Sequence, residues 1–301
     1  MTRFSGYLDD FGMVTLTLAG PLAAKFKAIR EAGFSHVMLD AKDIAADAGG
    51  MDSAVQAVKA SGLRVSGLQW LLDFEGLTGR QHDYKVEVAK GMLQMAHALG
   101  APVLLAAAST NPASSSDLAA IARDLRKLAM MAVPLGLKVA YEGHGSAHRI
   151  RDHFAAWDVV WRADMPNLGI AIDTAHAVAS PSSLDDLDLL EAYKIFVVRL
   201  ADFMQPSDAA APTGPRAPPG LRVFPGEGHQ SAAVADLVRR LAALGFRGDY
   251  SFEVFNDDYR QLPPPLVAGR AWAACEWLGE DVLRRSVPLP GRLRLRQASE
   301  A

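Results

Sequence analysis

Short runs of aliphatic and β-branched residues alternate along the chain with longer stretches in which apolar residues recur every three or four positions. The short runs predict strands, and the longer stretches predict amphipathic helices. Strands are expected at 13–18, 35–40, 63–69, 102–107, 135–142, 168–173, 194–202 and 250–255. Helices are expected at 21–33, 54–62, 82–99, 115–135, 150–163, 184–192, 230–244 and 265–280.

This regular alternation indicates a parallel sheet with right-handed crossovers, either open or closed into a barrel. Neither a GxGxxG motif nor a P-loop follows the first expected strand, which argues against a nucleotide-binding open sheet. We therefore predict an α/β fold, a (β/α)8 TIM barrel. One domain over 1–283 and a basic tail over 284–301 are expected, with the Pro-, Ala- and Gly-rich stretch 203–221 as a loop.

Composition and charge narrow the class of protein. Half of the residues are hydrophobic and the formal net charge is −3, which gives no electrostatic footprint for nucleic acid or an anionic membrane. The chain shows neither a secretory signal at its start nor an apolar run long enough to span a bilayer, and its single cysteine, Cys275, fits a reducing compartment. A cytoplasmic protein with a small-molecule partner is expected, and a homodimer is considered by analogy with other barrels.

The ends of the expected strands carry the candidate chemistry, because the active site of a (β/α)8 barrel is built there. The polar residues at these ends are Asp40, Gln69, Glu142, Asp173, Arg199 and Glu253. Burying several carboxylates at one rim is costly unless a cation compensates them, and oxygen ligands suit Mg²⁺ or Mn²⁺. We predict an acidic active site in which Glu142, Asp173 and Glu253 bind a divalent metal ion.

Three further side chains are candidates for catalysis or substrate binding. His176 lies three residues past Asp173, in an expected loop over the site, and histidine is a natural acid or base near neutral pH. His148, in YEGHGSAHRI together with His144, is a second candidate, and helix capping or surface exposure is the alternative for both. Arg222, in the turn segment RVFPGEGH, either holds a substrate carboxylate or forms an ordinary loop salt bridge.

Six segments carry a family resemblance: LQWLLDFEG (68–76), KVAYEG (138–143), WRADMPNLGIAIDTAH (161–176), VVRLAD (197–202), RVFPGEG (222–228) and SFEVFND (251–257). They resemble the xylose-isomerase-like barrel superfamily of sugar isomerases and epimerases, and within it bacterial 3-dehydroshikimate dehydratases. The resemblance extends over residues 13–280.

The resemblance implies a divalent metal held by Glu142, Asp173 and Glu253, a fourth ligand from the seventh strand, and a catalytic histidine at His176. Gln69, Asp73 and Glu75 match the family's segment after the third strand, and Arg222 matches its arginine before the Phe-Pro-Gly turn, which implies contacts with the substrate. The residues expected to bind substrate are Gln69, Glu75, His148 and Arg222.

Arg199 departs from the family pattern, which usually has a neutral glutamine or histidine at this place on the seventh strand. Arginine offers no lone pair and stays charged, so it cannot be the fourth ligand. Three carboxylates, a dication and Arg199 nevertheless sum to zero charge, so a three-ligand metal completed by water remains open. The other reading is that Arg199 ties the carboxylates together without a metal. We include Arg199 with His176 as an expected catalytic residue.

The expected function is that of a metal-dependent enzyme acting on a small polyhydroxylated carbonyl compound. The resemblance implies a lyase that removes water from 3-dehydroshikimate to give protocatechuate. A sugar or keto-sugar isomerase or epimerase is the alternative, because it passes through the same enolate and returns the proton to carbon. A non-catalytic binding barrel, with Arg199 in place of the metal, is the third reading.

Overall fold

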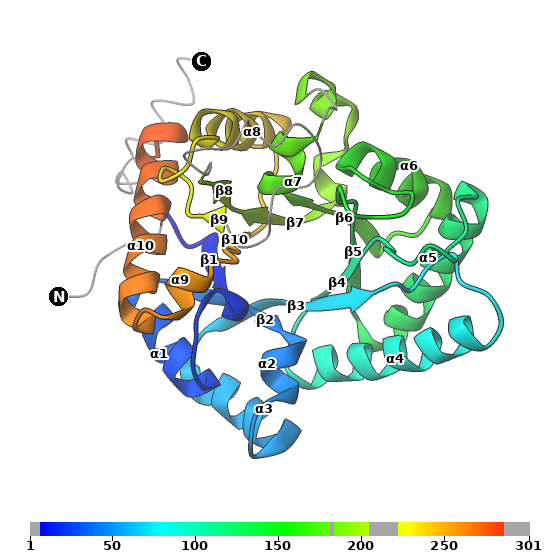
Figure 1. Cartoon of the computed structure of the whole chain (residues 1–301), viewed down its shortest axis with the longest axis horizontal. Helices are drawn as coiled ribbons and strands as arrows, with labels where there is room; N and C mark the ends of the chain where they lie inside the picture. The colour runs from blue at the N-terminus through cyan, green and yellow to red at the C-terminus, as the bar shows by residue number, and fades with distance from the viewer. Residues whose placement is uncertain (1–6, 181–183, 205–221, 286–301) are drawn as a thin grey trace, which may run out of the picture.

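Eight parallel strands close into a barrel in the computed structural model, which describes residues 7–180, 184–204 and 222–285. The barrel strands are β1 (Phe11–Val14), β2 (His36–Asp40), β3 (Arg64–Leu72), β4 (Val103–Ala107), β5 (Lys138–Glu142), β6 (Leu168–Asp173), β7 (Ile195–Leu200) and β10 (Tyr250–Phe252). Around the barrel they follow the order β1-β10-β7-β6-β5-β4-β3-β2, as Figure 1 shows. The predicted TIM barrel is confirmed.

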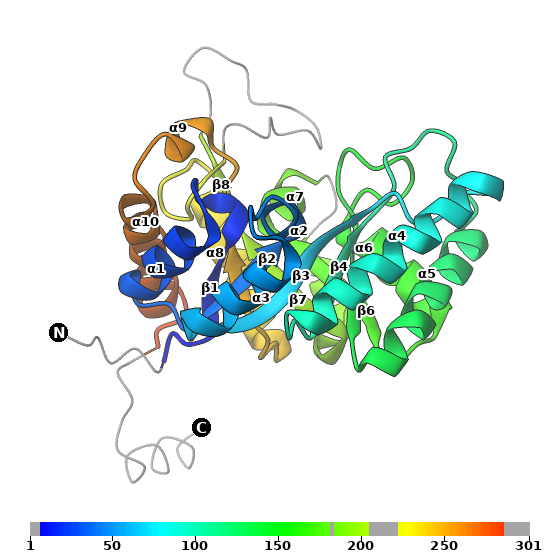
Figure 2. The same ribbon diagram turned by 90° about the horizontal axis from the view of Figure 1, so that it is seen from below.

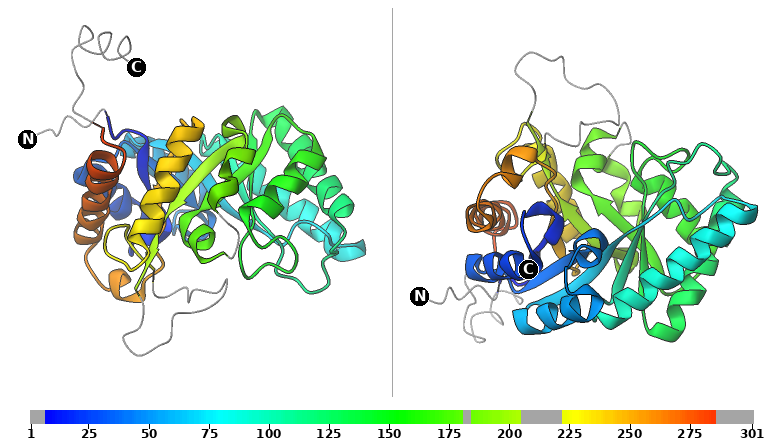
Figure 3. Two further views of the ribbon diagram at one scale, coloured as in Figure 1. Left: turned by 90° about the horizontal axis from the view of Figure 1, so that it is seen from above. Right: turned by 60° about the horizontal axis from the view of Figure 1, so that its bottom comes forward.

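Helices surround the strands (Figures 1 and 3). They are α1 (Leu22–Ala32), α2 (Ala41–Ala45), α3 (Gly50–Ser61), α4 (Gly79–Ala98), α5 (Leu118–Ala132), α6 (His153–Ala163), α7 (Thr174–Ala179), α8 (Ser231–Leu244), α9 (Asp257–Arg260) and α10 (Pro264–Glu276). Local chemistry sets several of their ends: Asp117 and Asp152 cap the starts of α5 and α6, and Gly33 ends α1 at a φ of 116°. The long helices therefore begin and end close to where the sequence pattern predicts.

The buried apolar residues form two clusters. The large cluster fills the space between strands and helices. The small one takes one or two residues from each of six strands, as expected for a layer of side chains inside a barrel. Its members are Val14, Met38, Val103, Leu105, Ala140, Ala171 and Val197. The barrel interior is packed below the strand ends, so polar chemistry is confined to the mouth.

The first strand is shorter than predicted. It ends at Val14, and Thr15–Thr17 form a 3₁₀ turn instead of continuing to residue 18. The Thr15 hydroxyl accepts from the backbone of Asp40, and the Thr17 hydroxyl donates to the Phe252 carbonyl at 3.2 Å. These threonine hydroxyls bond the neighbouring strand ends, which explains why a β-branched stretch leaves the ladder here.

The segment after β6 also differs from the prediction. The sequence indicates a loop at His176 and a helix over 184–192, whereas the structure has α7 directly after β6 and only 3₁₀ turns at Leu184–Leu189 and Ala192–Lys194. The Asp173 side chain accepts from the backbone of Ala175 and His176, and it therefore caps α7. His176 is a helical residue, so its direction is set by the helix and not by a loop.

A short antiparallel pair, β8 (Asp202–Phe203) with β9 (Arg222–Val223), was not predicted. The predicted loop 203–221 lies outside the described residues except for its first two positions. The pair lies on the same side of the barrel as α9, above the strands in Figure 2. Asp202 holds it in place by accepting from the backbone of Gln230 and the hydroxyl of Ser231. This pairing brings Arg222 to the barrel mouth.

Gly143, which directly follows Glu142, allows a close approach of two backbones. A Cβ atom added there would overlap the carbonyl of Asp152, the residue that caps α6, whereas one added at Gly91 in α4 would meet nothing within 4 Å. We expect Gly143→Ala to lower the free energy of unfolding by about 1–3 kcal/mol, because backbone must shift. Gly91→Ala, the matched control, should raise it by about 0.5–1 kcal/mol. Urea denaturation of both variants checks this, and equal effects would contradict the close approach.

Candidate active site

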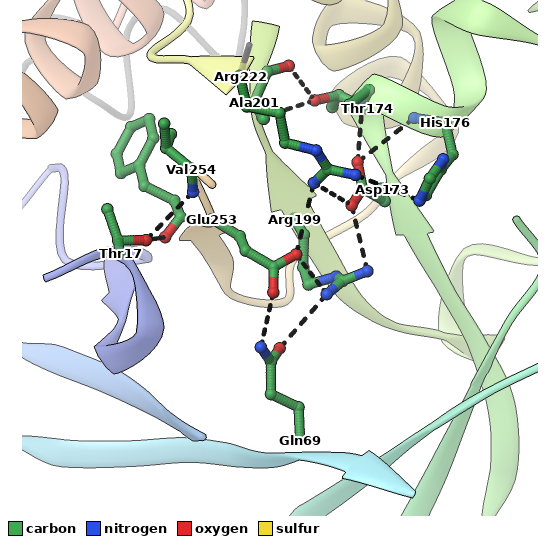
Figure 4. Close-up of polar contacts among 12 residues, drawn as sticks. Thr17, Gln69, Asp173, Thr174, His176, Arg199, Ala201, Arg222, Glu253 and Val254 are labelled. Carbon is green, nitrogen blue, oxygen red and sulfur yellow. Dashed lines mark hydrogen bonds and ion pairs between the residues drawn. The ribbon is translucent and has the colours of Figure 1, made fainter. Parts of the chain in front are cut away.

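A cluster of charged side chains lies at the C-terminal ends of β5, β6, β7 and β10. Figure 4 shows the part of it formed by Asp173, Arg199 and Glu253. Glu142 and Asp173 are the last residues of β5 and β6, Arg199 is next to last in β7, and Glu253 directly follows β10. Asp173 and Arg199 are register partners on neighbouring strands. The three carboxylates that the sequence singles out are therefore brought together, and so is Arg199.

The Arg199 guanidinium lies at the centre of the cluster. One of its terminal nitrogens pairs with Glu142 and lies 3.1 Å from Asp173 Oδ2, and the other pairs with Glu253. The second nitrogen also donates to Gln69 Oε1 at 3.4 Å. The side chain of Arg199 is 1% exposed, so one buried cation bridges all three carboxylates.

Arg222 adds a second guanidinium above the first. Its Nη1 lies 2.9 Å from Asp173 Oδ2 and 3.6 Å from Glu253 Oε2. Its Nη2 lies 3.2 Å from His176 Nε2, and its backbone carbonyl accepts from the Asn256 side chain. Arg222 thus forms a salt bridge with the acidic cluster, which was one of the two expectations for this residue. Its contact with His176 also places it where the other expectation, substrate binding, would be met.

Gln69 and Thr174 fix the framework of the cluster. Gln69 Nε2 donates to Glu253 Oε1 at 2.6 Å, so the amide bridges Glu253 and Arg199. The Thr174 hydroxyl donates to the Ala201 carbonyl and accepts from the Ala201 amide, which ties the start of α7 to the residue after β7. These contacts appear in Figure 4, where Gln69 and Asp173 approach Arg199 from opposite sides.

Two aromatic rings flank the guanidinium groups. The Arg199 Cζ lies 5.0 Å from the centre of the Trp70 ring, and the Arg222 Cζ lies 5.2 Å from that of Phe255. The two rings lie 5.6 Å apart. Cation–π contact stabilises a buried guanidinium further. Sequence reasoning missed both aromatic residues, although each lies within two positions of a residue it did select.

Burial dominates the electrostatics of the cluster. It raises the pKa of Glu142 to about 8 and raises the pKa of Glu253, while Arg199 opposes both changes. Burial would also raise the pKa of Asp173, but Arg222, His176 and Arg199 together hold it well below its usual value. The carboxylates raise the pKa of Arg199 against the effect of its burial. Asp173 and Arg199 are therefore the firmly ionised groups.

His176 is neutral in the folded protein. Burial lowers its pKa to about 3, and Arg222, His144 and Arg199 add to the effect against Asp173. His144 packs beside it with ring centres 5.6 Å apart, and its Nε2 lies 2.9 Å from the Ala108 carbonyl. A neutral imidazole has a ring-nitrogen lone pair that can accept a proton, but burial and the positive charge of Arg222 and Arg199 disfavour its protonated form, so His176 acts as a base only when bound substrate offsets that charge.

We expect the ring resonances of His176 to stay unchanged between about pH 5 and 8. An unfolded-chain histidine binds a proton near pH 6.5, and the folded state does not. The stabilisation from neutral His176 is therefore present above about pH 6.5 and is lost as the pH falls towards 3. Nitrogen-15 NMR, assigned by comparison with His176→Asn, checks this, and titration of His176 near neutral pH would contradict it.

Two residues expected to bind substrate lie elsewhere. Glu75 is 2% exposed, and its Oε1 accepts from the Ser109 amide and, at 2.8 Å, from the Tyr141 hydroxyl. It therefore holds the segment after β3 against β4 and β5. His148 is exposed, and its backbone amide donates to the Ser109 carbonyl. His144, and not His148, is the histidine of this segment that contacts the cluster.

The donor atoms that a divalent metal would need are already engaged. Glu142, Asp173 and His176 each offer one ligand atom, and these atoms lie within 4.8 Å of one another. However, Arg199 pairs with Glu142 and Asp173, and Arg222 contacts Asp173 and His176. A dication about 4 Å from one guanidinium is repelled by roughly 8 kcal/mol at an effective dielectric constant of about 20. The described residues therefore do not fit a divalent ion while both guanidinium groups lie there.

Comparison with known proteins gives the family. A family model described as a xylose isomerase-like TIM barrel matches residues 26–278. The chain is a xylose isomerase-like TIM barrel. This outcome confirms the resemblance expected from the strand-end segments.

Three proteins show how this xylose isomerase-like barrel relates to others. A protein of Pseudomonas aeruginosa named 3-dehydroshikimate dehydratase is 30% identical over 83% of this chain, and the match spans 39% of that relative. A solved xylose isomerase-like TIM barrel/4-hydroxyphenylpyruvate dioxygenase fusion protein is 26% identical, with a TM-score of 0.82 over 96% of this chain and 44% of that one. The chain thus spans about two fifths of these relatives.

The third is a crystal structure of the IolI protein with a bound zinc atom, which is 18% identical over 90% of this chain and 98% of that one. Its TM-score of 0.77 shows the same fold. Among the residues that our structure describes, no helix is long and apolar enough to cross a membrane.

Proposed function

We propose that this barrel is an enzyme that removes a proton beside the carbonyl group of a small polyhydroxylated ketone, as in the dehydration of 3-dehydroshikimate to protocatechuate. The observation that carries the proposal is the neutral imidazole of His176 held 3.2 Å from the Arg222 guanidinium at the barrel mouth. The name of the 30% identical relative supports a dehydratase, and the family name supports sugar-type substrates.

The proposed chemistry assigns the proton to His176. Its imidazole takes the proton from the carbon, and the electron pair moves onto the carbonyl oxygen as an enolate. The Arg222 guanidinium supplies a fixed positive charge for that oxygen when substrate replaces its contact with His176. The imidazolium then returns the proton to a leaving hydroxyl, which departs as water, or to a neighbouring carbon, which completes an isomerisation.

We assign no step to Mg²⁺ or Mn²⁺, because Arg199 and Arg222 engage the oxygens that would bind the ion. Gln69 was expected to bind substrate. Its side-chain amide is hydrogen-bonded to Glu253 and Arg199, so we propose that it acts on the substrate indirectly, by positioning these two residues.

The test is incubation of the protein with 3-dehydroshikimate in D₂O. The appearance of protocatechuate absorbance supports the lyase. Deuterium incorporation beside the ketone, without protocatechuate, would replace it with the isomerase or epimerase reading, in which proton removal survives. Absence of both, with a keto-inositol and a ketose tested in parallel, would overturn the proposal in favour of a non-catalytic binding barrel.

A further inference from the structure

We infer that the Arg199 guanidinium is the resident cation of this barrel and takes the place of a divalent metal among Glu142, Asp173 and Glu253. The inference concerns what holds the site together, and it is independent of which reaction the site performs. It predicts a site that is complete without metal and that opens to metal when Arg199 is removed.

The contacts identify Arg199 as the bridging cation. It is the described cation that reaches all three carboxylates, whereas Arg222 pairs with Asp173 and lies 3.6 Å from Glu253. The carboxylate side chains are at most 3% exposed, so bulk water does not solvate their charges. A buried carboxylate cluster needs such a partner.

The surroundings keep Arg199 in place. It begins on β7 as the register partner of Asp173, so its backbone already points its side chain towards the cluster. The Trp70 ring lies over the guanidinium, and Gln69 accepts one of its hydrogen bonds. The side chain is 1% exposed, and it would have to leave this enclosure before an ion could approach the three carboxylates.

Charge balance agrees with the contacts. Three carboxylates and two guanidinium groups sum to −1. A bound dication would bring the same set to +1 with two guanidinium groups within reach. Replacing Arg199 by a neutral residue and adding the dication gives −3, +2 and +1, which sum to zero. The cluster is therefore matched to one central cation, either Arg199 or a metal.

The experiment measures Mn²⁺ binding by calorimetry and by electron paramagnetic resonance, together with melting temperature, for wild type, Arg199→Gln and Arg222→Gln. We expect wild type to bind no stoichiometric Mn²⁺ and to keep its melting temperature in EDTA. Arg199→Gln should bind one Mn²⁺ at least about 100-fold more tightly than wild type and melt higher with Mn²⁺ than without. Arg222→Gln, which leaves the bridging cation, should gain far less.

Three results would overturn the inference. They are stoichiometric Mn²⁺ in wild type, equal gains in the two variants, or no gain in Arg199→Gln. Should Arg199→Gln fail to fold without metal, its refolding in the presence of Mn²⁺ but not of EDTA supports the inference. Arg199→His, which offers an imidazole ligand, repeats the measurement, and failure of both variants to fold or bind with Mn²⁺ counts against it.

Discussion

Replacing Arg199 by methionine is expected to lower the free energy of unfolding by about 3–5 kcal/mol at neutral pH. The substitution keeps a long apolar side chain but leaves Glu142, Asp173 and Glu253 buried with Arg222 as their remaining close cation. Removing one member of a buried ionic cluster destabilises a protein far more than replacing the whole cluster by apolar residues, because the remaining charges stay buried without a counter-ion. Urea denaturation followed by circular dichroism measures the change.

Two controls make this result specific to the cluster. Arg162→Met removes an arginine of half-exposed side chain that pairs with Asp158 one turn away on α6, and it should change the stability by at most about 0.5 kcal/mol. Adding Glu142→Gln to Arg199→Met should restore part of the loss, because a neutral amide replaces a buried carboxyl group that has lost its counter-ion. A loss below about 1 kcal/mol in Arg199→Met would show that the carboxylates have another counter-ion.

His176→Asn is expected to lower kcat by about 10²- to 10⁴-fold on the substrate of the enzyme, with little change in KM or melting temperature. Asparagine keeps a polar side chain beside Arg222 but cannot take a proton from carbon. The loss should therefore appear in the chemical step, and in deuterium exchange beside the ketone, and not in folding.

His97→Asn is the matched control for this variant. His97 is exposed near the end of α4, where its ring contacts the Leu135 carbonyl, and the same substitution there should leave kcat unchanged. Activity of His176→Asn within about tenfold of wild type would remove His176 from the proton transfer and leave the arginines as positioning residues for another base.

Much of the fold could be predicted because its signals are local. The alternation of strand and helix patterns gives the barrel, and the rule that barrel sites lie at strand ends gives Glu142, Asp173 and Glu253. Charge at the end of an apolar strand is visible in one sequence. The ion-pair partners of that charge cannot be read from one sequence, because they depend on which strand ends meet across the barrel.

The remaining features depend on side-chain contacts between distant segments. The β8–β9 pair that carries Arg222 rests on Asp202 binding residues 28 and 29 positions later. His176 is helical because Asp173, itself a site residue, caps α7. The sequence showed that Arg199 cannot be a ligand, and only the structure places its guanidinium among all three carboxylates.

The central claim is that Arg199 lies where a metal would otherwise bind, and anomalous diffraction from crystals grown with Mn²⁺ tests it most directly. The expected map has planar guanidinium density between Glu142, Asp173 and Glu253 and no anomalous peak within bonding distance of their oxygens. An anomalous peak at that position, with the Arg199 side chain turned away from the carboxylates, would contradict the claim.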